Sequence, residues 1–399
     1  MTAREVLASG RASGMVAPSA SGVNRSEIPR HLVHCLLLLR DQLSSPQRMG
    51  AHMIRSFVVV AALSLAFRVG VQAQEHTVIA LSHSDHTVYQ LDGNSGRIVN
   101  QFEAENQPHE SIVSPDGNTI FVAIPQAGHV VILDAATLKE KGRIDTEYFH
   151  RSDGTSTSPH GIAITSDGNK VYIGVERAKI PGIVIYDVRE ERVIGKLDVL
   201  LEGGHFLAID PRTDKLYYPM RSDNRVLVID TRTDRVEDII PVEGGPVGID
   251  FTPGGEAWIH SDYDGSVTVL DTRTGEVLDR IERTGTGAGR IAVSPDGRYA
   301  ASTRGGSKDV AIIDTRTREV VARVNVGGLG FPLFSPDGTK LYVMTSTTYT
   351  GSPPDVQLEA SGGVTVIDMR TMTAVARHRS GVSPFGGSIR YVGGRGTSR

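Results

Sequence analysis

The stretch Asp309-Val-Ala-Ile-Ile-Asp314 contains the pattern that decides the fold: alternating apolar residues end in an apolar-Asp pair. The same pair closes a similar run seven times along the chain. The seven pairs are Leu91-Asp92, Leu133-Asp134, Tyr186-Asp187, Ile229-Asp230, Leu270-Asp271, Ile313-Asp314 and Ile367-Asp368. Successive Asp positions differ by 42, 53, 43, 41, 43 and 54 residues, so the base period is about 42 residues with two longer intervals.

Each repeat contains four short apolar runs, which we name strands a, b, c and d. In the repeat around Asp314 the runs lie near 290–294, 298–302, 309–314 and 319–324. Strands a and b are joined by Ser-Pro-Asp-Gly at 114–117, 294–297 and 335–338. In this turn Pro fixes the first dihedral angle and Gly accepts the left-handed one. Four short strands in a period of roughly 40–45 residues predict an all-β propeller with seven blades, each of four antiparallel strands.

The two ends of the repeat region complement each other. The first repeat starts near His76 at its strand b and lacks strand a. The segment 384–391 reads as a lone strand a. Pairing the two would complete one blade from both ends and remove an open sheet edge. We therefore expect a ring closed between the N-terminal blade and the C-terminal strand.

The Asp of each apolar-Asp pair has a structural explanation. In three repeats it precedes Thr-x-Thr, within 230–233, 271–274 and 314–317. Its carboxylate can accept backbone N–H bonds across the c–d turn. We expect all seven to hold turns and none to act on a ligand.

The residues before the repeats have the composition of an export signal. Arg55 supplies a positive start, 57–67 is an apolar core, and 71–73 offers small residues for cleavage. The apolar run is too short to span a bilayer comfortably. We expect 1–52 to be an over-extended start or disordered leader, 53–73 a signal peptide and 74–399 the propeller, in a periplasmic or secreted protein. Residues 31–40 remain open as an amphipathic, membrane-proximal helix.

The charge of the chain argues against nucleic-acid binding. Lys and Arg number 42 against 46 Asp and Glu; without residues 1–73 the balance is 34 to 43, a formal net charge of −9. Sequence-independent binding to nucleic acid rests on basic surface, so single-stranded nucleic acid stays only a third alternative partner. The single cysteine, Cys35, precedes the repeats, so they contain no disulfide or thiolate metal site. We expect a monomer with no membrane span in the mature chain.

The repeats resemble the YVTN-type seven-bladed propeller repeats of exported bacterial proteins. Val171-Tyr-Ile-Gly174 and Leu341-Tyr-Val-Met344 stand in the place of the name-giving tetrapeptide, and the match covers about 76–392. The chain is more distantly similar to lactonase-type propellers and to the haem d1 domain of nitrite reductases. The resemblance implies the fold, and no motif narrows it to one reaction.

Two long connections mark one face of the expected ring. In a propeller the d–a and b–c connections share a face. Residues 145–158 lengthen a d–a connection, and 346–362 lengthen a b–c connection. Long irregular loops in a compact domain are often functional. We expect this face to contact a partner.

Three histidines occupy one equivalent position in consecutive repeats. His109, His160 and His205 each stand five residues before the a–b turn, where a d–a connection meets the innermost strand. Three imidazoles from neighbouring strands can hold Zn, Cu or Fe and leave a position open for water or substrate. The alternative is that each imidazole packs between blades and contacts the backbone of its neighbour.

Further polar residues are expected near the same rim. The candidate ligand-binding residues are His83, His86, Arg177, Arg221, Arg290 and Arg304. Two functions remain open. The first is an exported propeller that binds a small polar ligand or a metal ion at a His-rich channel mouth and contacts a protein partner. The second is a metal-assisted hydrolase, lyase or oxidase with Glu110 or His260 as acid or base.

Overall fold

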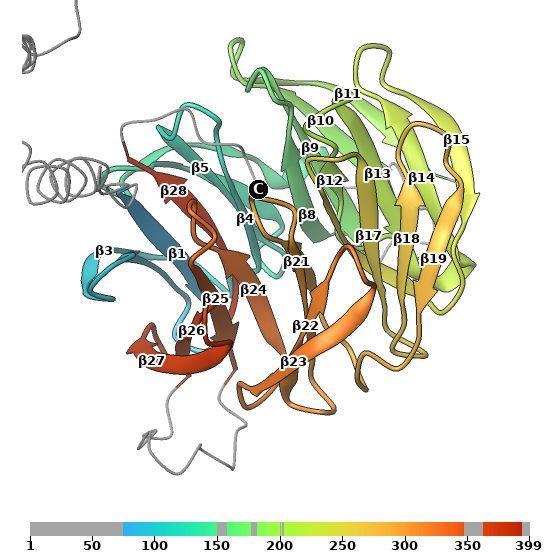
Figure 1. The fold of residues 1–399 in the computed structure, drawn as a ribbon. Helices are drawn as coiled ribbons and strands as arrows, with labels where there is room; N and C mark the ends of the chain where they lie inside the picture. Colours follow the sequence, from blue (N-terminus) through green and yellow to red (C-terminus); the bar gives the residue numbers. More distant parts are fainter. Residues whose placement is uncertain are drawn as a thin grey trace, which may run out of the picture. The chain divides into compact units, whose positions relative to one another are not determined.

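A computed structural model of the protein describes residues 75–149, 158–176, 182–199, 201, 203–346 and 362–392. Within these residues, seven antiparallel sheets of four strands each form a propeller, as the repeat period predicts. Figure 1 shows the sheets set around a common centre, with the chain passing from one blade to the next.

The strand bounds follow the repeats closely. Blade 1 contains β28 (Pro384–Tyr391), β1 (His76–Ser82), β2 (Thr87–Asp92) and β3 (Ile98–Glu103). Blade 2 contains β4 (Glu110–Val113), β5 (Thr119–Ile124), β6 (His129–Asp134) and β7 (Glu140–Ile144). Blade 3 contains β8 (Ser158–Ile164), β9 (Lys170–Glu176), β10 (Gly182–Asp187) and β11 (Arg192–Asp198). Blade 4 contains β12 (Ala208–Ile209), β13 (Lys215–Met220), β14 (Arg225–Asp230) and β15 (Arg235–Pro241).

The remaining blades repeat the pattern. Blade 5 contains β16 (Pro246–Phe251), β17 (Glu256–Ser261), β18 (Val267–Asp271) and β19 (Val277–Ile281). Blade 6 contains β20 (Ile291–Val293), β21 (Tyr299–Arg304), β22 (Asp309–Asp314) and β23 (Glu319–Asn325). Blade 7 contains β24 (Gly330–Phe334), β25 (Lys340–Thr345), β26 (Gly363–Asp368) and β27 (Thr373–Arg379). Two short 3₁₀ helices, η1 (Thr146–Phe149) and η2 (Arg221–Asp223), lie in connections.

Apolar side chains fill the gaps between neighbouring blades. Ile112 and Phe121 of blade 2, for example, pack with Ile162 and Ile173 of blade 3. Corresponding buried clusters occupy all seven gaps. The alternating strands therefore cover one another's apolar faces, and the burial of this surface stabilises the ring.

The ring closes in the way the sequence predicts. β28 pairs antiparallel with β1, with Val78 opposite Ile389 and Ala80 opposite Gly387. The last strand thus supplies the innermost position of the first blade, and both neighbours of that position, β4 and β24, contact it. The seven inner strands surround a central channel.

The seven repeat Asp residues hold turns, as expected. Each accepts at least one hydrogen bond from a backbone N–H two or three residues further on. At Asp314 the Oδ1 atom accepts from the backbone N–H groups of Arg316 and Thr317, both at 3.0 Å. The side chain thereby satisfies donors that the c–d turn leaves outside the sheet.

Asp314→Ala is expected to lower the free energy of unfolding by about 1 kcal/mol, because two backbone donors lose their acceptor. Asp314→Asn should retain most of the stability, since the amide oxygen can still accept. Urea denaturation of the three proteins measures both effects. An alanine variant as stable as the parent would show that water replaces the carboxylate without loss.

The predicted leader and signal segments, 1–52 and 53–73, lie outside the described residues, so their assignment stays a prediction. Among the residues that the structure describes, there is no helix with the length and hydropathy needed to cross a membrane.

Candidate metal centre at the channel mouth

A row of histidines crosses one mouth of the channel. His83 follows β1, His109 directly precedes β4, His160 lies in β8, and His205 precedes β12. The centroids of successive rings are 4.9, 4.2 and 4.4 Å apart in this order. Four neighbouring blades therefore present imidazoles to one another. His109, His160 and His205 come from equivalent positions near the starts of inner strands, whereas His83 lies in the β1–β2 connection of blade 1. We call these four residues the histidine row.

Two phenylalanines pack against the histidine row. The Phe385 ring lies 4.9 Å from the His83 ring and 5.2 Å from the His109 ring, centroid to centroid. The Phe206 ring lies 5.1 Å from the His160 ring and 4.3 Å from the His205 ring. The aromatic rings remove water from the imidazoles, so the row lies in an environment that disfavours charge.

Burial keeps two imidazoles of the row, those of His83 and His205, neutral. It lowers the pKa of His83 to about 3, with the neighbouring His109 and His86 acting in the same direction. Burial, Arg290, Arg221 and His109 hold the pKa of His205 well below its usual range. The neutral ring is the form of histidine that binds metal ions.

Glu110 lies directly beside the row. It begins β4, its side chain is buried, and its Oε1 atom is 3.5 Å from Nδ1 of His109. Oε1 accepts no hydrogen bond from the part of the chain that the structure describes. Burial raises the pKa of the Glu110 carboxyl to about 8, while the positive charge of Arg290 partly opposes that rise. A buried carboxyl group in this state is suited to a cation that can replace its proton.

His109, Glu110 and His160 form the group of potential metal ligands. Each offers one ligand atom, and these atoms lie within 4.8 Å of one another. Two atoms bonded to one ion at about 2.1 Å can be at most about 4.2 Å apart, so small side-chain movements would bring all three to bonding distance. The third member beside His109 and His160 is thus Glu110. His205, the third ligand expected from the sequence, packs against the His160 ring outside this group.

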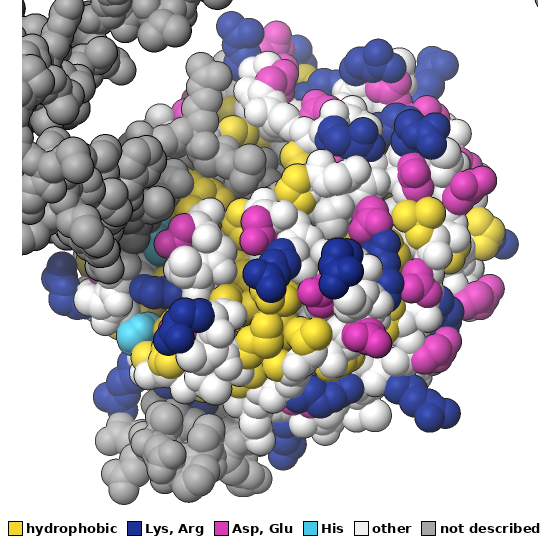
Figure 2. All heavy atoms as spheres, in the orientation of Figure 1, with side chains coloured by type: hydrophobic (Ala, Val, Ile, Leu, Met, Phe, Trp, Pro, Cys, Tyr) yellow, Lys and Arg dark blue, Asp and Glu magenta, His cyan; other side chains and the backbone are white. Residues whose placement is uncertain are grey.

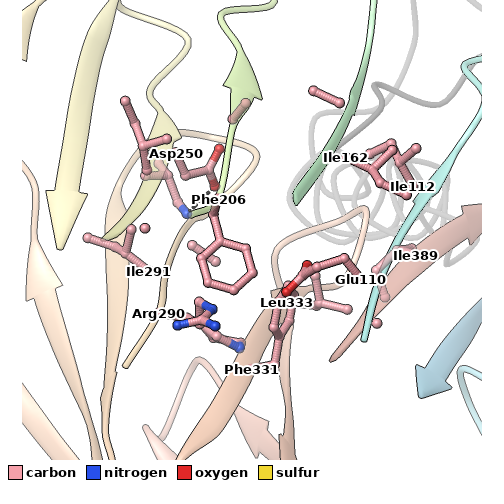
Figure 3. Close-up of a pocket in the computed structure, with 18 of the residues that line it drawn as sticks. Glu110, Ile112, Ile162, Phe206, Asp250, Arg290, Ile291, Phe331, Leu333 and Ile389 are labelled. Atoms are coloured by element: carbon pink, nitrogen blue, oxygen red, sulfur yellow. Dashed lines mark hydrogen bonds between the residues drawn. The ribbon is translucent and has the colours of Figure 1, made fainter. Parts of the chain in front are cut away.

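The channel beneath the mouth holds a cavity of about 150 Å³. Its walls come from the inner strands and include Ile112, Ile162 and Leu333, while Glu110 and Arg290 lie on its polar side (Figure 3). The guanidinium carbon of Arg290 is 3.3 Å from the centroid of the Phe206 ring, so a buried cation stacks on an aromatic face.

The structure places His260 away from this cavity. His260 is fully buried in β17, and its Nδ1 atom is 3.1 Å from Oγ of Ser302. Its Nε2 atom is 3.2 Å from Oδ1 of Asp262 and 3.0 Å from Nη1 of Arg304. Both ring nitrogens are engaged in a network between blades 5 and 6, and His260 is not among the residues that line the cavity.

Arg304 differs from its expected position at the rim. Its side chain is fully buried, and its guanidinium donates to the carbonyls of Ser261 and Ser266 and to Oγ1 of Thr284. Burial lowers the pKa of Arg304 to about 10. These bonds tie β21 to the connections of blade 5, so Arg304 holds blades together and is not presented to a ligand.

The other candidate residues fall in different places. Arg221 begins η2, with Nη1 3.6 Å from Oδ2 of Asp262. His86 lies in the turn between β1 and β2, three residues after His83, and its backbone φ is 53°. Arg177 and most of the two long connections lie outside the described residues, so their roles stay predictions. The sequence reasoning missed Phe206 and Asp262, although Phe206 adjoins His205 directly.

The buried His260 makes the stability of the protein sensitive to acid. Burial, with the charge of Arg304, lowers its pKa from 6.5 to about 4, so between these values only the unfolded chain takes up the proton. The contribution of the neutral His260 ring to the free energy of unfolding is complete above pH 6.5. It is lost as the pH falls to about 4, which lowers the free energy of unfolding by about 3 kcal/mol. The difference in unfolding free energy between the parent and His260→Gln should therefore shrink by about this amount from pH 7 to pH 4. Urea titrations at several pH values measure it; parallel curves would contradict the assignment.

In sequence, the chain is similar to two uncharacterized proteins. No protein-family model matches it. It is 23% identical over 198 residues to the uncharacterized protein YncE of Salmonella typhimurium (strain LT2), and 23% identical over 197 residues to that of Salmonella typhi. Each match covers 48% of this chain and 52% of the relative, so the chain spans about half the length of the curated relatives it matches.

Solved structures share the fold. A functionally unknown protein from Desulfotomaculum acetoxidans has a TM-score of 0.64 at 16% identity, over 79% of this chain and 99% of that one. Hydrazine synthase of Kuenenia stuttgartiensis has a TM-score of 0.58 at 21% identity, over 70% of this chain and 88% of that one. The dihydro-heme d1 dehydrogenase NirN, in complex with DHE, has a TM-score of 0.54 at 16% identity, over 78% of this chain and 74% of that one. The fold and these relatives fit a YVTN-type seven-bladed propeller, as the repeats predict.

Proposed function

We propose that this protein is a metal-binding propeller, which holds one divalent transition-metal ion through His109, Glu110 and His160 at the mouth of its channel. The observation that supports this most strongly is the position of Glu110. Its carboxyl group is buried beside two imidazoles, and its Oε1 atom accepts no hydrogen bond from a described residue. A buried carboxyl oxygen without a hydrogen bond costs free energy that a bound cation would offset.

The chemistry of the donor set narrows the choice of ion. Two imidazoles and one carboxylate bind zinc in thermolysin-type sites and Fe(II) in facial-triad sites, both of which keep positions open for another ligand. The repeat region contains no cysteine, which disfavours soft, thiolate-dependent ions. We therefore propose Zn²⁺ or Fe²⁺ as the resident ion.

The surroundings of the group favour binding without large rearrangement. His160 lies in the inner strand β8, and His109 directly precedes the adjacent inner strand β4, with its backbone N–H donating to the carbonyl of Ala123 at 2.9 Å. Their backbone positions are therefore fixed by the sheets. The flanking rings of Phe385 and Phe206 restrict how the imidazoles turn. Ligands held on rigid elements lose little conformational freedom when the ion binds.

Metal analysis of purified protein tests the proposal. After chelator treatment and titration with Zn²⁺, the parent should bind one equivalent and melt at a higher temperature, because the ion binds only the folded chain. The His109→Ala/His160→Ala variant should bind none at this site. His378→Gln, which alters a histidine of the outer strand β27, serves as the matched control and should bind one equivalent. A full equivalent in the double variant would contradict the proposal.

A further inference from the structure

The cavity below the proposed metal centre has two chemically different ends. Glu110 begins β4 and Arg290 directly precedes β20, both on the side of the histidine row. Figure 3 shows their side chains pointing into the same space. Asp250 lines the cavity near the end of β16. Its Oδ2 atom accepts from the backbone N–H of Val293 at 2.7 Å, and its Oδ1 atom accepts from that of Phe251 at 2.8 Å.

The walls between these ends are apolar and close together. They are made by side chains of the inner strands, among them Ile112, Ile162, Ile249, Ile291, Leu333 and Ile389. In another protein, an engineered cavity of about 150 Å³ lined by Leu, Ile and Phe stays dry and binds benzene. The volume here is also about 150 Å³, which fits an apolar body of about six carbon atoms.

Charge decides which end of such a ligand faces which end of the cavity. The Arg290 guanidinium is buried and stacked on Phe206, and a buried cation of this kind attracts a carboxylate strongly. The carboxylate of Asp250 repels an anion from the opposite end. A ligand with one negative charge is therefore oriented with that charge toward Arg290 and the histidine row.

We propose that the ligand of this site is a small monocarboxylic acid with an apolar body of about six carbon atoms. Its carboxylate faces Arg290 and the open positions of the metal ion, and its body fills the channel cavity. This inference rests on the metal-binding function proposed above, because the ion supplies the second positive charge. Neither a dicarboxylic acid nor a neutral molecule of the same size matches both ends.

Titration calorimetry with benzoate as probe tests this inference. Zinc-loaded protein should bind benzoate at least about 10-fold more tightly than acetate, which lacks the body, or benzamide, which lacks the charge. Arg290→Gln should weaken benzoate binding by about 10- to 100-fold while the protein keeps its zinc. Arg298→Gln, which alters an exposed arginine, is the matched control and should bind benzoate as the parent does.

The outcomes separate the two proposals, since zinc content is measured in the same samples. Zinc binding with equal affinity for benzoate, acetate and benzamide overturns the ligand assignment and leaves the metal centre standing. Benzoate binding that is insensitive to Arg290→Gln also overturns it. Failure to bind zinc overturns the proposed function, and the same titration of metal-free protein then shows whether Arg290 alone holds the acid. Affinity for benzoate that falls when zinc is removed supports both.

Discussion

Glu110→Gln is expected to lower the affinity of the protein for Zn²⁺ by at least about 100-fold, because the variant loses the one anionic ligand of the proposed centre. A neutral amide cannot offset the charge of the ion in a site from which the phenylalanine rings exclude water. The affinity is measured by competition with a chelator of known strength.

Two controls make this result specific. The Glu110 carboxyl has a raised pKa of about 8 in the folded protein, so it is largely protonated at neutral pH and the amide is close to it in shape and charge. The metal-free variant should therefore melt close to the metal-free parent. Glu319→Gln, at the exposed start of β23, should bind Zn²⁺ as the parent does. Unchanged affinity in Glu110→Gln would show that the histidines bind the ion without the carboxylate.

Gly387→Val is expected to destabilise the protein by about 3 kcal/mol or more, because it disrupts the strand that closes the ring. A Cβ atom at Gly387 would lie 2.2 Å from the carbonyl oxygen of Ile79 in β1 and 2.6 Å from Cε of Met344. Backbone oxygen cannot move aside without breaking the pairing of β28 with β1. Urea or thermal unfolding measures the loss.

Gly142→Val is the matched control for this substitution. Gly142 also lies in a strand, β7, but a Cβ atom there would meet no atom within 4 Å. Valine suits a strand, so the stability should stay within about 0.5 kcal/mol of the parent. If both valine variants were equally stable, closure through β28 would not be the main constraint on the ring.

The repeat pattern was sufficient to predict the architecture. The apolar-Asp period defines seven equivalent units, and equivalent units can bury their apolar faces only against one another. The lone strand at 384–391 and the missing strand a before His76 then leave one way to close the ring. These inferences depend on the pairing of strands that are neighbours in the sequence and on the number of strands in each repeat, and both can be read from the sequence.

The repeat pattern also predicted that three of these histidines lie close together. His109, His160 and His205 occupy the same place in three successive repeats, and the inner strands of neighbouring blades adjoin. The grouping of Glu110, rather than His205, with His109 and His160 did not follow. β12 spans only Ala208–Ile209, so His205 lies outside the regular strand, whereas Glu110 is the first residue of β4 beside His109. Irregularity in one blade changes side-chain positions in a way that the repeat pattern does not encode.

The roles of Arg304 and His260 depended on contacts between blades. Both stand at the ends of b strands, which the sequence places near the mouth. The structure joins them directly, Nε2 of His260 to Nη1 of Arg304. Each also contacts a residue of a connection whose path no period determines: His260 contacts Asp262, and Arg304 donates to Thr284. Such buried polar networks are set by tertiary packing and could not be read from strand positions.

The central claim is that two imidazoles and one carboxylate hold a metal ion at the channel mouth. Anomalous X-ray diffraction at the zinc absorption edge, on crystals of zinc-loaded protein, tests it most directly. We expect one strong peak about 2.1 Å from a ring nitrogen of His109, a ring nitrogen of His160 and a carboxylate oxygen of Glu110. Peaks at surface histidines only, with none between these three side chains, would contradict the account.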